Sequence, residues 1–237
     1  MVDKLYPKKF ELSREGEKME GQGSTGEKIV ILGTNLFAPE VLDLIEDTGR
    51  FEVTAFIENW DRKKTNQPLL GRPVVWIDNA ASLASSHKAV CSIGSTHRQG
   101  FIQQAAALGF QFTTVIHPSA RLSKMSSVGK GSILSAGVIV GSNTKVGNHV
   151  IINRGSLIGH NTVIHDYVTI SPGTNIAGVV SIGEATYISM GAIVLDRITI
   201  GNHAVIGAGA VVTRDVPDRV QVMGIPARII KKDIEGR

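Results

Sequence analysis

In the second half of the chain, hydrophobic positions recur every six residues. From Leu122 to Val212 all sixteen residues at this spacing are aliphatic, with no insertion to break the register. A small or β-branched residue, such as Ser126 or Thr162, stands four places after each of them. Neither a helix, with a period of 3.6 residues, nor an alternating strand gives a period of six. The pattern is typical of a parallel β-helix, whose aliphatic residues fill the interior of stacked coils. Glycine follows the aliphatic position in seven of the sixteen hexads, where we expect a bend with positive φ.

The first half has a different pattern, in which short apolar runs alternate with helical periodicity. We expect strands over residues 28–33, 51–57, 74–76, 90–93 and 112–116, and helices over 38–47 and 101–108. Such alternation predicts a small parallel sheet with helices on its faces. The fold class is therefore an α/β Rossmann-like domain followed by an all-β parallel β-helix.

These patterns divide the chain into four parts. Residues 1–27 are rich in charge and are expected to be a flexible arm. The Rossmann-like domain spans 28–117, the β-helix spans 118–220, and a C-terminal cap and tail span 221–237.

Composition narrows the class of protein. The net charge of +4 comes from 25 basic and 21 acidic residues spread along the chain, which gives no case for nucleic-acid binding. The single cysteine, Cys91, excludes an internal disulfide. The sequence has no run of 18 apolar residues and no apolar core of a signal peptide, so we expect a cytoplasmic protein without a membrane span.

The hexads, their closing segment Met223-Gly224-Ile225-Pro226-Ala227-Arg228 and the junction His117-Pro118-Ser119-Ala120 carry a family resemblance. Over residues 28–230 the chain resembles the hexapeptide-repeat sugar acetyltransferases of the PglD and NeuD type, which include the bacillosamine and perosamine N-acetyltransferases. The resemblance implies a left-handed β-helix and a homotrimer with active sites between adjacent β-helices. It also implies a nucleotide-linked sugar held by the Rossmann-like domain, acetyl-CoA as acyl donor along the β-helix, and no metal.

His160 is the candidate catalytic base. It stands at the third position of its hexad, which should point outward, in the segment Ser156-Leu157-Ile158-Gly159-His160. A protonated sugar amine must lose a proton before it attacks a thioester, and imidazole is suited to take it. The resemblance assigns the family's catalytic histidine to His160, whereas a surface histidine on a corner is the alternative interpretation.

Two neighbours qualify this assignment. The family usually has an aspartate or glutamate after the histidine, but this chain has Asn161, which can orient the ring without supplying charge. We therefore consider Asp166 as the carboxylate that supports the base. Otherwise the base is weaker, or catalysis relies mainly on positioning of the two substrates.

Residues of later coils are the candidates for acetyl-CoA. Many relatives have a histidine near the thioester where this chain has Thr169, and Gly178 matches an amide that faces the thioester carbonyl. The resemblance places the pantetheine arm along a further group, with packing as the alternative for its small residues: Met190, Gly191, Gly207 and Ala208.

The carboxyl ends of the expected strands are the candidates for the nucleotide-linked sugar, because ligands of open parallel sheets bind there. These candidates are Gly33, Thr34, Asn35, Glu58, Asn59, Gly94 and Ser95. Relatives have a glycine-rich turn with a histidine after the first strand, of which only Gly33 is present, and paired aspartates where Glu58 and Asn59 stand. A domain that only packs on the β-helix is the alternative.

The resulting hypothesis is an acetyl-CoA-dependent N-acetyltransferase that acts on a UDP-, dTDP- or GDP-linked 4-amino-4,6-dideoxy sugar, with His160 as general base. Three alternatives stay open. The first is O-acetylation of a sugar hydroxyl, and the second is a zinc enzyme similar to the γ-class carbonic anhydrases, suggested by the spacing of His160 and His165. The third is a non-catalytic binding protein or scaffold.

Overall fold

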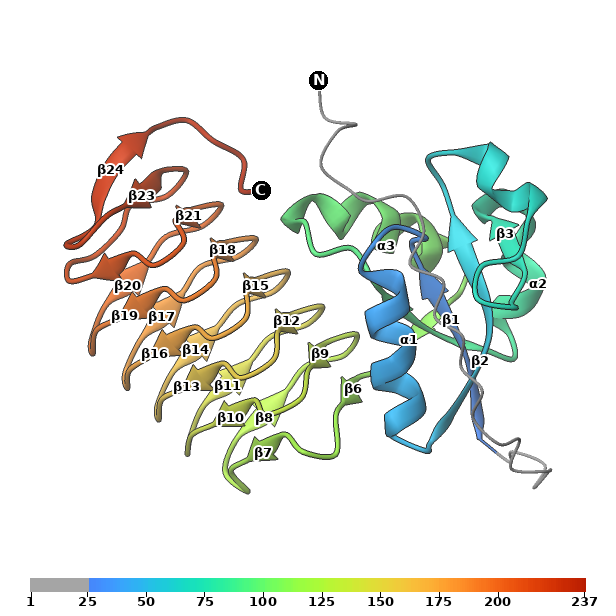
Figure 1. Ribbon diagram of the computed structural model, residues 1–237, viewed down its shortest axis with the longest axis horizontal. Helices are drawn as coiled ribbons and strands as arrows, with labels where there is room; N and C mark the ends of the chain where they lie inside the picture. The colour runs from blue at the N-terminus through green and yellow to red at the C-terminus, as the bar shows by residue number, and fades with distance from the viewer. Residues whose placement is uncertain (1–25) are drawn as a thin grey trace, which may run out of the picture.

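The computed structural model describes residues 26–237. The arm expected over residues 1–27 therefore lies outside the described residues, apart from Gly26 and Glu27. The described chain forms an N-terminal α/β part and a β-helix that lie side by side (Figure 1).

The N-terminal part contains a five-stranded parallel sheet in the order β3-β2-β1-β4-β5. Its strands are β1 (Glu27–Leu32), β2 (Phe51–Glu58), β3 (Val74–Trp76), β4 (Lys88–Cys91) and β5 (Gln111–Phe112). Its helices are α1 (Ala38–Asp47), α2 (Ala81–Ala84) and α3 (Gln99–Ala107), with short 3₁₀ turns η1 (Arg62–Asn66), η2 (Ile77–Asn79) and η3 (Thr96–Arg98). The expected helix over 38–47 is confirmed; its apolar residues Val41, Leu42, Leu44 and Ile45 are buried.

The β-helix is a left-handed prism with three parallel sheets, each named here by its lowest-numbered strand. The β7 sheet contains β7 (Arg121–Leu122), β10 (Ile139–Val140), β13 (Leu157–Ile158), β16 (Asn175–Ile176), β19 (Ile193–Val194) and β22 (Val211–Val212). The β8 sheet contains β8 (Ser127–Val128), β11 (Lys145–Val146), β14 (Val163–Ile164), β17 (Ser181–Ile182) and β20 (Thr199–Ile200). The β6 sheet contains β6 (Val115–Ile116), β9 (Ile133–Leu134), β12 (Ile151–Ile152), β15 (Thr169–Ile170), β18 (Tyr187–Ile188), β21 (Val205–Ile206), β23 (Gln221–Met223) and the antiparallel β24 (Arg228–Lys231).

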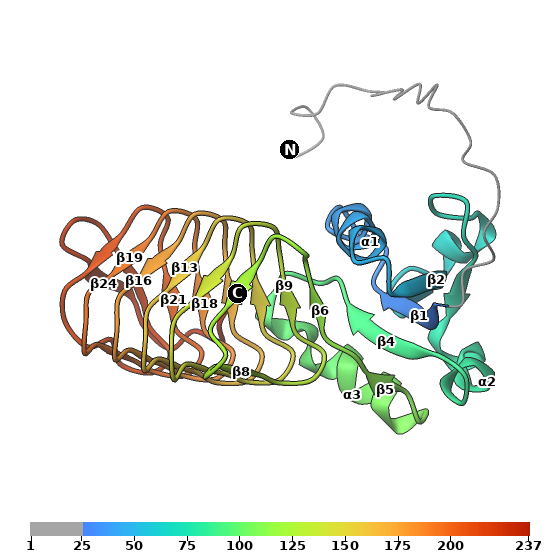
Figure 2. The same cartoon turned by 90° about the horizontal axis from the view of Figure 1, so that it is seen from below.

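One coil of the prism takes 18 residues, so residues 18 apart lie above one another. The aliphatic hexad positions, such as Ile158 and Ile176, are buried in one continuous core, which confirms the sequence pattern. Figure 2 shows the coils stacked along the axis of the prism.

The expected role of the glycines after the aliphatic positions is wrong. Positive φ occurs two residues later in the turns, for example at Asn161 with φ of 56°. Gly159 has ordinary φ, but a Cβ there would lie 2.4 Å from the main-chain carbon of Ala177 in the next coil. Glycine at this position therefore permits close stacking of coils rather than a left-handed bend.

The two parts share a core along the outer face of the β6 sheet. Val115, Ile133 and Ile151 point out of the prism and pack in one cluster with α1 and β1. The strand expected over 112–116 is accordingly divided, because β5 completes the N-terminal sheet while β6 pairs with β9 of the β-helix. Within residues 26–237 no helix is long and apolar enough to cross a bilayer.

Candidate functional site

His160 lies in the turn between β13 and β14, at the corner where the β7 and β8 sheets meet. We call the stacked turns 123–126, 141–144, 159–162 and 177–180 the His160 corner. The imidazole is exposed, and its Nδ1 lies 2.9 Å from Oδ1 of Asn161. Because an amide oxygen only accepts, Nδ1 is the donor in this contact, and in the neutral ring Nε2 is then the nitrogen with a lone pair. Asn161 thus orients the ring and fixes the tautomer that a base requires.

Gly178 lies one coil after His160 and directly against its ring. A Cβ at Gly178 would fall 2.7 Å from Nε2 and 2.8 Å from Cε1 of His160, so only glycine leaves the ring in this position. Among residues 26–237, no acceptor receives a hydrogen bond from the Gly178 N–H. The corner therefore combines a basic nitrogen with a free amide donor, the two groups that acyl transfer to an amine uses.

Asp166 does not support the base in this chain, contrary to expectation. It lies in the turn between β14 and β15, at the next corner of the prism. Its carboxylate accepts hydrogen bonds from the N–H of Asn148 at 2.7 Å and from Nδ2 of Asn148 at 3.1 Å. Six residues are one third of a coil, so His160 and Asp166 occupy equivalent places on different corners.

Thr169 is likewise not free to meet a thioester. It is buried on the outer face of the β6 sheet, where its hydroxyl donates to the carbonyl of Gly94 at 2.9 Å and accepts from Nη1 of Arg98 at 2.7 Å. Arg98 also donates to the carbonyls of His149, Tyr167 and Val168. Thr169 and Gly94 therefore belong to the contact between the two parts of the protein.

The other residues expected to meet acetyl-CoA lie at the third corner, between the β6 and β7 sheets. Met190, Gly191 and Ala208 are exposed there. Gly207 is buried, because β23 covers it and a Cβ at 207 would lie 2.4 Å from Cγ of Met223. A ligand can reach Met190, Gly191 and Ala208, but not Gly207, and these three do not share a corner with His160.

At the carboxyl ends of β1 and β2, the structure brings together Gly33, Thr34, Asn35 and Glu58. Oε1 of Glu58 accepts hydrogen bonds from the N–H groups of Asn59, Trp60 and Asp61. Oε2 accepts from the Thr34 hydroxyl and forms an ion pair with Lys64 at 3.9 Å. Burial raises the pKa of Glu58, but the hydrogen bonds from Thr34, Trp60 and Asp61 and the charge of Lys64 outweigh it, and the net pKa is lowered. Glu58 is thus a buried carboxylate that shapes the loop rather than a free ligand group.

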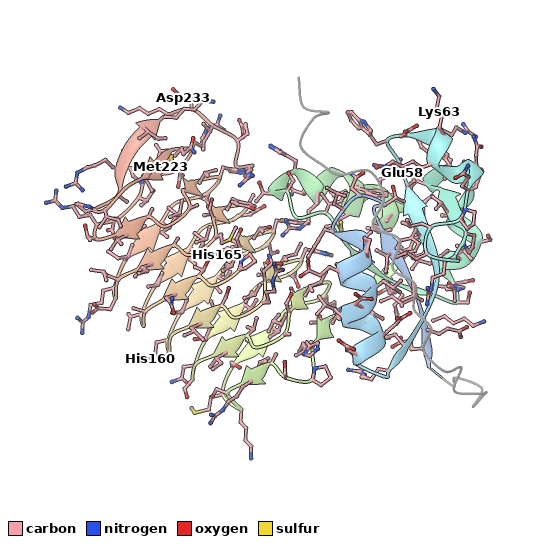
Figure 3. All side chains as sticks on the ribbon, viewed as in Figure 1. Glu58, Lys63, His160, His165, Met223 and Asp233 are labelled. Carbon is pink, nitrogen blue, oxygen red and sulfur yellow. The ribbon has the colours of Figure 1, made fainter. Side chains whose placement is uncertain are left out.

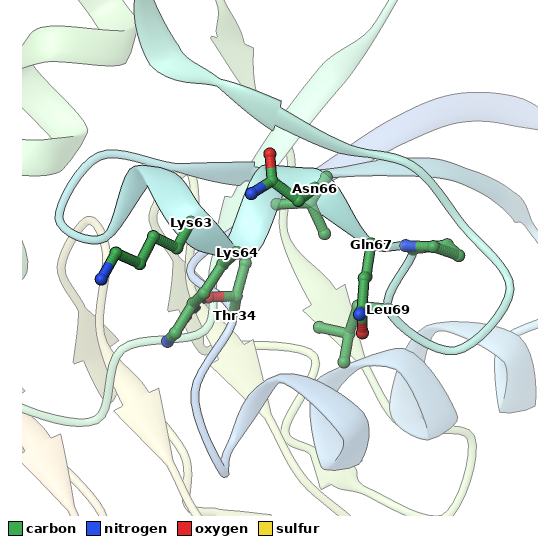
Figure 4. Close-up of a pocket in the computed structure, with 8 residues that line it drawn as sticks. Thr34, Lys63, Lys64, Asn66, Gln67 and Leu69 are labelled. Atoms are coloured by element: carbon green, nitrogen blue, oxygen red, sulfur yellow. Dashed lines mark hydrogen bonds between the residues drawn. The ribbon is translucent and has the colours of Figure 1, made fainter.

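A cavity of about 390 Å³ opens beside this cluster (Figure 4). Thr34 lines it, together with four polar residues that sequence reasoning did not identify: Lys63, Lys64, Asn66 and Gln67. Nζ of Lys64 is held by Thr34 Oγ1 at 3.1 Å and Asn35 Oδ1 at 2.6 Å. The basic run Arg62-Lys63-Lys64, close after the second strand, was the available signal, because cations beyond a strand's carboxyl end favour anionic ligands.

The remaining expected ligands point elsewhere. The Asn59 side chain donates to Gln104 at 3.1 Å on the surface. Ser95 donates to the main-chain oxygen of Arg237 at 2.6 Å, so Ser95 faces the C-terminal tail and Gly94 faces the β-helix, and neither is shown to face the cavity.

The two candidate centres are far apart in one chain. Figure 3 shows Glu58 at the top of the N-terminal part and His160 at the lower left, on the far side of the prism. Among residues 26–237, no group of three or more His, Cys, Asp or Glu side chains is placed to hold a metal ion.

Comparison with known proteins supports one chemistry. The family model "Bacterial transferase hexapeptide (six repeats)" matches residues 180–214. A mutant of perosamine N-acetyltransferase from Caulobacter crescentus, solved with CoA and GDP-perosamine, is 31% identical and aligns over 86% of this chain and 97% of that chain, with a TM-score of 0.80. The acetyltransferase domain of PglB from Neisseria gonorrhoeae, solved with acetyl coenzyme A, is 29% identical over 86% of this chain and 100% of that chain, with a TM-score of 0.79. WeeI from Acinetobacter baumannii is 28% identical over 85% and 99%, with a TM-score of 0.70. No curated protein sequence gives a significant match.

The alignment with the perosamine enzyme covers 97% of that chain, and in this chain it includes both the α/β part and the β-helix. The chain is an acyltransferase and belongs to the hexapeptide-repeat sugar N-acetyltransferases of the PglD and NeuD type.

Proposed function

We propose that the protein transfers an acetyl group from acetyl-CoA to the amine of a nucleotide-linked 4-amino-4,6-dideoxy sugar, with His160 as general base. The observation that carries this proposal is the contact between the His160 ring and Gly178, which puts a free Nε2 beside a free amide N–H. The relatives solved with CoA and GDP-perosamine support both substrate classes.

The reaction follows from these groups. Nε2 of His160 takes a proton from the sugar ammonium, and the neutral amine attacks the thioester carbonyl carbon. The Gly178 N–H stabilises the oxyanion that develops on the carbonyl oxygen. A C–N bond forms, the C–S bond breaks, and the CoA thiolate leaves and takes the proton from the imidazolium of His160. The nitrogen loses its second proton to solvent, so the products are a neutral amide, the CoA thiol and one released proton.

We infer a homo-oligomer, with the trimer of the hexapeptide family as the expected state. Beyond its first two strands, the outer face of the β7 sheet carries the exposed apolar side chains Leu157 and Ile193. The corresponding positions of the β8 sheet are mostly polar, as at Lys145, Ser181 and Thr199. An apolar sheet face beside the base favours coverage by another chain.

A complete site then requires two chains. Met190, Gly191 and Ala208 occupy a different corner from His160, so they can meet one acetyl-CoA molecule only if they come from a neighbouring prism. The nucleoside also requires a neighbour, because the cavity beside Glu58 lies across the molecule from His160 of the same chain (Figure 3). We assign the nucleoside to this cavity, where the amides of Asn66 and Gln67 can donate to or accept from a base edge.

The test is a substrate panel. The purified protein is mixed with acetyl-CoA and UDP-, dTDP- and GDP-linked 4-amino-4,6-dideoxy sugars, while thiol release is followed and products are identified by mass spectrometry and NMR. Thiol release with one sugar, together with an amide-linked acetyl group, supports the proposal. An ester-linked acetyl group would indicate a hydroxyl acceptor, and failure to bind acetyl-CoA would exclude the proposed reaction.

A further inference from the structure

A second cavity, of about 620 Å³, lies on the β7 sheet side of the His160 corner, near the start of the β-helix. Six residues define its chemistry: Arg121, Ser123, Lys124, Met125, Ile139 and Ser142. Met125 is 67% exposed and Ile139 is 45% exposed, so the cavity combines an apolar surface with hydroxyl and cationic groups.

The position of this cavity relative to His160 is fixed by the stacking of coils. Ser142 precedes His160 by one coil, and Lys124 precedes it by two in the same corner. Gly178 lies one coil on the other side of His160. His160 therefore lies between Gly178, whose N–H is proposed to bind the thioester oxygen, and a cavity to which the proposed function assigns no part of either substrate.

The charge of the cavity indicates an anionic ligand. Arg121 and Lys124 are exposed, and no acidic residue lines the cavity. Neither cation forms an ion pair with any carboxylate of residues 26–237, whereas Arg154, Arg197 and Arg219 each do. The hydroxyl of Ser123 donates to Ser142 at 3.2 Å, and the hydroxyl of Ser142 can in turn donate to a phosphate oxygen.

We propose that Arg121 and Lys124 bind the diphosphate of the acceptor sugar while its amine faces His160. This inference rests on the proposed function and deepens it. Coils are separated by about 4.8 Å, so the main chain at both Arg121 and Lys124 lies about two such spacings from the level of the base, a distance that their long side chains can shorten. In a 4-amino sugar one pyranose ring separates the amine from the phosphate on C1, which matches this reach, and the C6 methyl can contact Met125 or Ile139.

The diphosphate of CoA does not fit the same place. With the thioester at His160 and Gly178, the whole extended pantetheine arm separates the reacting carbon from the phosphates of CoA. That arm is longer than two spacings of about 4.8 Å. If the cavity binds the diphosphate of the sugar, loss of the cations should raise KM for the nucleotide-linked sugar. If it binds the diphosphate of CoA, the same loss should raise KM for acetyl-CoA.

The experiment measures steady-state kinetics of Arg121→Ala, Lys124→Ala and the double variant with the nucleotide-linked sugar that the wild type acetylates. Lys145→Ala, which removes an exposed lysine from the β8 sheet, is the matched control. Because each cation would form charge-assisted hydrogen bonds to the diphosphate, each single variant should raise KM for the nucleotide-linked sugar by about tenfold. KM for acetyl-CoA and the rate with the methyl glycoside of the same amino sugar, which has no phosphate, should not change.

Three results would overturn the proposal. The first is variants that behave as Lys145→Ala does, and the second is an increase in KM for acetyl-CoA instead of the sugar. The third is an equal loss with the methyl glycoside, which would indicate a structural defect. None of these three results would contradict the proposed function, because all three are measured against a wild-type enzyme that is active. A wild type without activity on any sugar would remove both proposals.

Discussion

The imidazole of His160 rests on Gly178, the residue one coil later, with no room for a side chain between them. This contact places the proposed base beside the proposed amide donor. The contact also explains why residue 178 is glycine. The φ of Gly178 is ordinary, so its backbone conformation does not require glycine, and the space taken by the His160 ring does.

Gly178→Ala should impair catalysis without unfolding the protein. The methyl group would displace the imidazole, a side-chain movement that the β-helix tolerates. We expect kcat to fall about a hundredfold, the scale of a lost general base or oxyanion donor, with a small change in melting temperature. Gly100→Ala is the control, because its Cβ meets no atom within 4 Å. Unchanged kcat in Gly178→Ala would separate this contact from catalysis.

Asn161 should act by orienting His160. Asn161→Ala removes the acceptor of the Nδ1 proton, and we expect kcat/KM to fall about tenfold. Asn161→Asp keeps the acceptor and adds a charge that stabilises the imidazolium, so its kcat/KM should equal or exceed that of the wild type. The comparison requires saturating acetyl-CoA and a varied sugar concentration. An aspartate variant as impaired as the alanine variant would contradict the orienting role.

Arg98 should contribute strongly to stability, because it is buried and donates to carbonyls of both parts of the protein. Arg98→Ala leaves these buried acceptors unpaired and should lower the free energy of unfolding by about 3 kcal/mol in denaturant titration. Arg154 also joins the two parts, through an exposed ion pair with Glu40. Arg154→Ala should cost less than about 1 kcal/mol, and similar losses in both variants would refute the distinction.

His149 should make stability depend on pH. Burial, and then the charge of Arg98, lower its pKa from the ordinary 6.5 to about 4, against the opposing effect of Asp166. Between these values the unfolded chain binds a proton that the folded protein does not. The contribution of His149 to the free energy of unfolding therefore decreases as pH falls from about 6.5 to 4.

His149→Asn removes this titration and keeps a residue that tolerates the φ of 54° at position 149. The stability of the variant should fall less steeply than that of the wild type over this pH range, although packing with Tyr167 is lost. His165→Asn, at an exposed histidine, should retain the wild-type slope. A His149→Asn slope equal to the wild type would show that this histidine titrates normally in the folded protein.

The hexad pattern predicted the β-helix, since a period of six has few structural explanations. It did not settle which residues meet, because proximity in this fold depends on 18-residue spacing. Gly178 stands 18 residues after His160 and contacts it, whereas Asp166 stands six residues after His160 and lies at another corner. That distinction was available from the sequence. The burial of Thr169 under Arg98 was not, because it depends on how the N-terminal part packs on the β6 sheet.

The sequence pattern also could not identify the cavity residues Lys63, Asn66 and Gln67. They lie in η1 and the loop after it, where neither apolar periodicity nor strand ends mark a position. Glu58 was correctly placed at the end of β2, but its carboxylate is occupied by main-chain N–H groups. A sequence shows that a carboxylate is present, but it does not show whether main-chain N–H groups already donate hydrogen bonds to it.

The central claim is that His160 is the base, and the most direct test compares His160→Gln with His165→Gln on the sugar that the wild type acetylates. His160→Gln should lose between about a hundredfold and ten-thousandfold in kcat while it still binds acetyl-CoA, since general-base catalysis contributes on this scale. His165→Gln, with its side chain at a different corner, should keep the wild-type rate. A His160→Gln variant that retains wild-type kcat would contradict the account.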